Sequence, residues 1–325
     1  MMPAIVPDCV WPVAATLGEG ACWDAAARRV LFVDIKGRRL HRYDPAGGGR
    51  ESWQAPGQIG FALPCADGTL ICGVQGGLFR FAPSSGQFTR VLPLEADLPG
   101  NRLNDAYVDA GGQLWFGSMD DAEAAPTGRL YRVGQDGRVS AHDAGYVITN
   151  GPAASPDGRT LYHTDTLRRL VYAFDLGDDG VPRRRRVFVA IRERGYPDGM
   201  AVDAEGGVWI ALFDGARIER YAPDGRLLGQ VAFPCANVTK LAFGGDDLRT
   251  VYATTATKGL SEAERHAQPL AGALFAFRAP LAGLAPADAR CASRRRRERG
   301  PAWRGAGRGG AGRGGHRPMP RAQTR

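Results

Sequence analysis

The sequence predicts an all-β fold, a six-bladed β-propeller with a central metal site, and a regular repeat is the first observation behind this prediction. Turns of the Asp-x-x-Gly kind lead six times into strongly β-prone runs, whose centres are 39 to 47 residues apart. Units of about 40–45 residues with several short strands are typical of propeller blades. The six runs cover residues 30–35, 69–74, 113–118, 160–165, 207–212 and 250–255.

A second, aromatic-rich β run follows each of the first runs and completes a hairpin pattern. Only residues 260–268 resemble a helix. A pair of β-sandwiches would not explain a regular period, whereas a closed ring also leaves few strand edges free, which suits a monomer. The second runs are residues 40–43, 78–81, 130–133, 171–174, 218–221 and 273–277.

The chain divides into a propeller over residues 1–285 and a tail over residues 286–325. The tail is rich in Arg, Gly, Ala and Pro, a composition that buries too little apolar surface to fold, so we expect it to be disordered. It reads either as a frameshifted or read-through end of a GC-rich gene or as an RNA-binding arm. GC-rich coding agrees with the use of 39 Arg and only three Lys, at positions 36, 240 and 258.

Charge and composition argue against several classes of partner. The tail carries 12 Arg against two acidic residues, so the formal charge of +8 leaves the first 285 residues with a net charge of −2. We therefore expect no nucleic acid on the propeller, and the absence of long apolar runs predicts no membrane span. No signal peptide is evident, so we expect a cytoplasmic protein whose six scattered cysteines are buried thiols.

Four segments carry polar residues at nearly the same place in the repeat. Glu19, Asn104, Asn150 and Asp198 lie 11 to 13 residues before the aromatic centre of the β run that follows each of them. Groups at one phase of a closed repeat converge in space. We read these segments as loops that together form an active site.

Glu19, Asn150 and Asp198 supply two carboxylates and an amide carbonyl, which suit a hard divalent cation such as Ca²⁺, Mg²⁺ or Mn²⁺, with Zn²⁺ also acceptable. Asp198 lies between Pro197 and Gly199 and could serve as ligand and general base together. Arg102 and Asn104 offer the donors and acceptors that a polyhydroxylated sugar derivative requires. The structural alternative is that these Asn and Asp side chains cap turns.

Several motifs, in order, resemble those of the regucalcin/gluconolactonase family. They are Leu17-Gly-Glu-Gly, Asn101-Arg-Leu-Asn-Asp, Phe116-Gly-Ser-Met and Pro197-Asp-Gly-Met. The resemblance covers residues 8–284 and implies a six-bladed propeller that binds one divalent metal ion. It implies that Glu19, Asn150 and Asp198 hold the metal and that Asp198 is also the catalytic acid/base.

The resemblance further implies that Arg102 and Asn104 contact the substrate. An acidic substrate contact is expected just after the third motif, where Asp120, Asp121 and Glu123 compete and Asp121 is preferred. Lys240 departs from the family, which usually has small residues there; it either reaches the rim of the channel or lies on the surface.

The function that the resemblance implies is metal-dependent hydrolysis of a sugar lactone, an aldonolactone, to its aldonic acid. The alternatives are a calcium-binding regulatory propeller without catalysis, an esterase acting on other activated esters, and a propeller used as a protein-interaction platform. The five histidines show no zinc-binding spacing, and neither a Gly-x-Ser-x-Gly nucleophile motif nor a Walker loop occurs.

Overall fold

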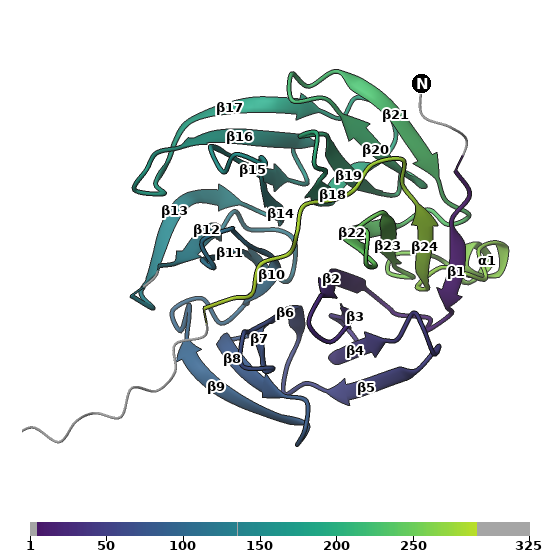
Figure 1. The fold of residues 1–325 in the computed structure, drawn as a ribbon, viewed down its shortest axis with the longest axis horizontal. Coiled ribbons are helices and arrows are strands. Elements are labelled where there is room, and N and C mark those ends of the chain that lie inside the picture. The colour runs from purple at the N-terminus through teal and green to yellow at the C-terminus, as the bar shows by residue number, and fades with distance from the viewer. Residues whose placement is uncertain (1–4, 135, 291–325) are drawn as a thin grey trace, which may run out of the picture. The chain divides into compact units, whose positions relative to one another are not determined.

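Six four-stranded antiparallel sheets form a ring in the computed structural model, which describes residues 5–134 and 136–290 (Figure 1). The predicted six-bladed propeller is therefore confirmed. Blade one contains β2 (Gly18–Asp24), β3 (Arg29–Asp34), β4 (Arg39–Tyr43) and β5 (Arg50–Gln54). Blade two contains β6 (Ile59–Pro64), β7 (Leu70–Val74), β8 (Gly77–Ala82) and β9 (Gln87–Pro93). Blade three contains β10 (Asn101–Val108), β11 (Leu114–Asp120), β12 (Gly128–Val133) and β13 (Val139–Tyr146).

The remaining blades close the ring. Blade four contains β14 (Thr149–Ala154), β15 (Thr160–Asp165), β16 (Leu170–Leu176) and β17 (Pro182–Ala190). Blade five contains β18 (Tyr196–Val202), β19 (Val208–Phe213), β20 (Arg217–Tyr221) and β21 (Leu227–Ala232). Blade six contains β22 (Val238–Gly244), β23 (Thr250–Thr255) and β24 (Leu274–Arg278), completed by β1 (Asp8–Trp11), which pairs antiparallel with β24. The helix expected near residues 260–268 is α1 (Glu262–Ala267), which begins with a capping box at Ser261.

The predicted aromatic centres of the blades are buried. Trp115 and Trp209 are 1% and 0% exposed, and each indole N–H donates to the aspartate of the turn before its strand. Trp115 Nε1 lies 3.1 Å from Asp109 Oδ2, and Trp209 Nε1 lies 2.7 Å from Asp203 Oδ2. The Asp-x-x-Gly turns therefore both reverse the chain and satisfy the polar atom of a core tryptophan.

The functional segments are not loops, as the sequence suggested, but the innermost strands of their blades. Low β-propensity residues such as Asn104, Asp105 and Asp198 hide these strands from a pattern search. Register shifts interrupt the inner strands between Glu19 and Cys22, Leu103 and Ala106, Asn150 and Ala153, and Pro197 and Met200. Bulges of this kind redirect side chains beside active sites.

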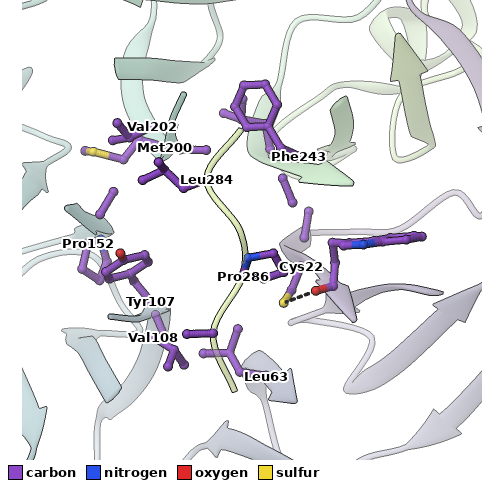
Figure 2. Close-up of a pocket in the computed structure, with 18 of the residues that line it drawn as sticks. Cys22, Leu63, Tyr107, Val108, Pro152, Met200, Val202, Phe243, Leu284 and Pro286 are labelled. Atoms are coloured by element: carbon purple, nitrogen blue, oxygen red, sulfur yellow. Dashed lines mark hydrogen bonds between the residues drawn. The ribbon is translucent and has the colours of Figure 1, made fainter. Parts of the chain in front are cut away.

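Residues 281–290, here called the strap, cross the ring after β24 (Figure 1). Gly283 bridges to Asp203 of blade five, and Ala289 bridges to Cys65, which follows β6 in blade two. Beneath the strap lies a cavity of about 140 Å³, lined mainly by apolar side chains such as Met200, Phe243 and Leu284 (Figure 2). Residues 286–290 of the predicted tail thus hydrogen-bond to the propeller, whereas residues 291–325 lie outside the described part of the chain.

Four cysteines are free thiols: Cys72 and Cys235 are buried, as expected, whereas Cys9 and Cys22 are only partly buried. Cys65 is not a free thiol, because it is disulfide-bonded. No helix within the described residues is long and apolar enough to cross a membrane.

We expect the protein to lose stability on acidification because two of its histidines are buried. Burial lowers the pKa of His163 and that of His41 to about 4 in each case. The unfolded chain binds these protons near pH 6.5 and the folded protein only near pH 4. The contribution of the two neutral histidines to the free energy of unfolding is therefore fully present above pH 6.5 and is lost as the pH falls from 6.5 to 4.

His163→Phe keeps a ring against Tyr146, which His163 contacts edge-on. The substitution should remove up to about 3 kcal/mol of the loss in unfolding free energy between pH 7 and pH 4. Denaturant titrations of both proteins at the two pH values measure this difference. An equal loss in both proteins would contradict it.

Candidate active site

Three blades bring Glu19, Asn150 and Asp198 to the centre of the ring, at the N-terminal ends of β2, β14 and β18. All three side chains are buried, with exposures of 3–5%. Gly20 and Gly151, which follow two of them at the bulges, have positive φ values of 60° and 40°. Such a backbone favours glycine, so the turn that aims each preceding side chain inward is encoded locally.

Glu19 and Asp198 form a buried carboxylate pair. Burial, and then the charge of Asp105, raises the pKa of Glu19; burial, and then the charge of Glu19, raises the pKa of Asp198 well above its usual range. The contact between the two side chains contributes to the pKa of each. Asp198 Oδ1 is buried without a hydrogen-bond partner. An unpartnered oxygen between two acids is what a divalent cation satisfies.

Hydrogen bonds fix the orientation of Asn150. Its Oδ1 accepts from Asn104 Nδ2 at 2.7 Å, and its Nδ2 donates to Thr166 Oγ1 at 3.0 Å. Thr166 Oγ1 in turn donates to the carbonyl oxygen of Pro197 at 2.9 Å. The amide of Asn150 is therefore held in one orientation, with its oxygen on the side of Asn104. Within the part of the chain that the structure describes, no group of three or more His, Cys, Asp or Glu side chains is arranged to hold a metal ion.

Arg102 and Asp121 form the second part of the site. Arg102 is 3% exposed; its Nε donates to Asp121 Oδ1 at 2.8 Å, and its Nη1 donates to Asn104 Oδ1. Asp121 also accepts from Lys36 Nζ at 2.6 Å and from Gln58 Nε2 at 2.8 Å. Burial works to raise the pKa of Asp121, but these two hydrogen bonds and the charge of Arg102 hold it at about 2. Asp121 is therefore a permanent anion that orients Arg102.

The other two acidic candidates after β11 have different partners. Asp120 accepts backbone hydrogen bonds from Ala122, Ala124 and Ala125 and so shapes the turn. Glu123 forms an ion pair with Lys258 of blade six. Of the three, Asp121 alone is joined to Arg102.

Hydrogen bonds connect four of the predicted site residues, from Asp121 through Arg102 and Asn104 to Asn150. Glu19 and Asp198, from blades one and five, form a separate buried pair. The arrangement combines buried carboxyl groups whose pKa values are raised with fixed hydrogen-bond donors. Such groups can exchange a proton and hold a polar substrate, as hydrolysis requires.

A family model described as the SMP-30/Gluconolactonase/LRE-like region matches residues 17–257. The chain belongs to this family. It is 33% identical over 279 residues to a 6-deoxy-6-sulfogluconolactonase from Pseudomonas putida, covering 85% of this chain and 96% of that one. It is 36% identical to an L-arabinolactonase from Azospirillum brasilense, covering 84% and 91% of the two chains.

Solved structures agree with this membership. A calcium-binding protein, regucalcin, from Agrobacterium tumefaciens superposes with a TM-score of 0.84 at 28% identity, covering 89% of this chain and 98% of that one. The family predicted from the motifs is therefore confirmed.

Sequence reasoning missed several residues that this member of the SMP-30/gluconolactonase family places beside the predicted set. They are Lys36, Gln58 and Lys258, together with Thr166, which orients Asn150. One signal was present in the sequence, namely that the chain has only three lysines against 39 arginines. In the structure each lysine pairs with an acidic residue of blade three: Lys36 with Asp121, Lys240 with Asp105 and Lys258 with Glu123. Lys240 does not lie on the surface, because its side chain is only 7% exposed and its ammonium group pairs with Asp105.

Proposed function

We propose that this protein hydrolyses a sugar lactone to its aldonic acid and depends on a divalent cation. The observation that carries the proposal is the buried Glu19–Asp198 pair, with its unpartnered Asp198 oxygen, beside the Arg102–Asn104 pair. The lactonases among the relatives support the same reaction class. The donors are all oxygen atoms, which agrees with Ca²⁺, Mg²⁺ or Mn²⁺ and also admits Zn²⁺.

Glu19, Asn150 and Asp198 would hold the cation. When bound, such a cation polarises a carbonyl and stabilises the negative charge that develops on its oxygen. Beside such a charge the pKa of Asp198 would fall, so that Asp198 would be ionised and able to accept a proton.

Asp198 then acts as the general base. It takes a proton from water as the water oxygen forms a bond to the lactone carbonyl carbon. It returns that proton to the ring oxygen as the bond between this oxygen and the carbonyl carbon breaks. The product is the open-chain hydroxy acid, and a base placed in this way contributes about 10²–10⁴-fold to the rate.

The substrate would be bound and oriented by Arg102, Asn104 and Asp121. Arg102 and Asn104 present fixed polar groups to the sugar hydroxyls, while Asp121 holds the Arg102 guanidinium in place. The carboxylate of Asp121 already accepts hydrogen bonds from Lys36 and Gln58. Its contribution to substrate binding is therefore to orient Arg102 and to accept a hydrogen bond from a sugar hydroxyl with its remaining lone pairs.

Arg102→Ala should therefore impair the use of substrate more than the binding of metal. We expect kcat/KM to fall at least about tenfold, mainly through KM, since charge-assisted hydrogen bonds contribute about 1.5–3 kcal/mol. Steady-state kinetics and calorimetric metal titration measure the two effects. Arg80→Ala, at an exposed ion pair of blade two, is the control. A loss of metal binding with an unchanged KM would contradict the assignment.

A panel of glucono-, xylono-, arabino- and galactonolactone tests the substrate class. Acid release is followed with a pH indicator and corrected for spontaneous hydrolysis. We expect turnover of at least one of these pentono- or hexonolactones; activity confined to simple esters would replace the lactonase by an esterase.

The second candidate is a calcium-binding regulatory propeller, which the similarity to a calcium-binding regucalcin favours. Tight Ca²⁺ binding without turnover of any lactone in the panel would support it. The cytoplasmic location, the monomeric state and the lack of nucleic-acid binding by the propeller stay predictions.

A further inference from the structure

A second buried ion pair lies directly beside the candidate active site. Lys240 Nζ is 2.6 Å from Asp105 Oδ2, and the two side chains are 7% and 1% exposed. Lys240 lies on β22 and Asp105 on β10, each at a register shift of its inner strand. Removing one partner of such a pair leaves an uncompensated buried charge, which strongly destabilises a protein.

Asp105 connects this pair to the proposed ligand Asn150. Its Oδ2 accepts from the backbone N–H of Gly151 at 2.8 Å, and its Oδ1 accepts from the N–H of Ala106 at 2.8 Å. Gly151 directly follows Asn150 at the bulge of β14. Through this bond Asp105 anchors the turn that carries Asn150.

Lys240 also touches the segment of Asp198. A Cβ at position 199 would overlap Lys240 Cδ and lie 2.9 Å from Thr239 O, so Gly199 allows the lysine stem to pass beside Asp198. On its other side Lys240 lines the cavity beneath the strap, whose walls are mainly apolar (Figure 2). Water on that side is a poor substitute for the ammonium group as a partner of Asp105.

The charges at the centre of the ring require such a partner. Glu19, Asp105 and Asp198 are buried within interaction range of one another, and Lys240 opposes the mutual repulsion that they exert. Lysine is also the rarer choice in a chain with 39 arginines. A compact ammonium on a narrow stem suits the close passage beside Gly199.

We propose that Lys240 is a built-in cation of the site. It neutralises Asp105, and this pair keeps the Asn150–Gly151 turn and the neighbouring carboxylates assembled whether or not a divalent cation is bound. Lys240 is a positioning residue in this account, because it acts through Asp105. Of the two measurements that test this inference, the one with added cation rests on the proposed metal site.

The first readout is the melting temperature in EDTA. Lys240→Met keeps most of the stem volume and should lower it by about 5–15 °C, because it leaves Asp105 unpaired. Asp105→Asn should lower it by a similar amount, whereas the double variant Lys240→Met/Asp105→Asn should return close to the wild-type value. Lys258→Met, at the partly exposed pair with Glu123, is the matched control and should change it by less than about 3 °C.

The second readout is the rise in melting temperature on adding CaCl₂ or MnCl₂. This rise should be larger in Lys240→Met than in the wild type, because a divalent cation replaces part of the positive charge lost with Lys240. In the double variant the rise in melting temperature should equal the rise in the wild type. A packing defect would lower the melting temperature equally with and without cation.

Two results would overturn the proposal: a Lys240→Met protein as stable in EDTA as the wild type, or a double variant at least as unstable as the two single variants combined. If the wild type shows no rise with any cation, the proposed metal site fails, while the comparison in EDTA still decides the role of Lys240.

Discussion

Asp198→Asn should leave the propeller folded and lower kcat at least about 100-fold, the lower limit expected when a general base is lost. Asparagine keeps the shape of the side chain and an oxygen for the cation, but it does not accept a proton from water near neutral pH. In the absence of cation the variant should be at least as stable as the wild type, since it removes one member of a buried carboxylate pair.

The measurement is kcat at saturating lactone and cation, with circular dichroism and melting temperature as tests of folding. Asp224→Asn, at an exposed turn outside the site, is the matched control and should keep normal turnover. Normal turnover by Asp198→Asn would remove Asp198 from the role of base. Loss of turnover together with loss of cation binding would assign it to the ligand role alone.

Glu19→Gln should weaken the binding of the divalent cation at least about 100-fold. Loss of an outer partner of a metal ligand already weakens binding about 10–100-fold, and Glu19 is proposed as a charged ligand itself. The same substitution removes the repulsion between Glu19 and Asp198, so the melting temperature in EDTA should rise. Function and stability are opposed at this position, as they often are where charges are gathered for catalysis.

Calorimetric titration with CaCl₂ and MnCl₂ tests the affinity of Glu19→Gln, and melting curves in EDTA test its stability. Glu51→Gln, at an exposed ion pair of blade one, should change neither quantity by much. A Glu19→Gln protein that binds cation as tightly as the wild type would show that the cation, if bound, lies elsewhere.

The repeat made the fold predictable because hairpin strands carry strong β and turn signals. The second and third strands of each blade, for example β3 and β4, agree with the predicted runs to within a few residues. The innermost strands were taken for loops, since residues such as Asn104 and Asp198 lack β propensity. Their bulges depend on pairing with a neighbouring strand, which local sequence does not reveal.

Residues that occupy the same position within each repeat were predictable, because a closed ring of blades brings equivalent positions close together. Glu19, Asn104, Asn150 and Asp198 were found in this way. Partners from turns at other phases were not, and Lys36 and Gln58, which hold Asp121, are examples. The burial of Lys240 also escaped prediction, because a lysine normally lies at the surface unless a tertiary partner such as Asp105 is provided.

The central claim is that lactone hydrolysis depends on the cation held by Glu19, Asn150 and Asp198. The most direct test strips the protein with EDTA, removes the chelator and follows acid release from the best lactone of the panel while Ca²⁺, Mg²⁺, Mn²⁺ or Zn²⁺ is added in increasing amounts. The account predicts that stripped protein stays folded, loses nearly all activity and regains it with about one equivalent of at least one cation. Full activity of the stripped protein, or inactivity with every cation despite measurable binding, would contradict it.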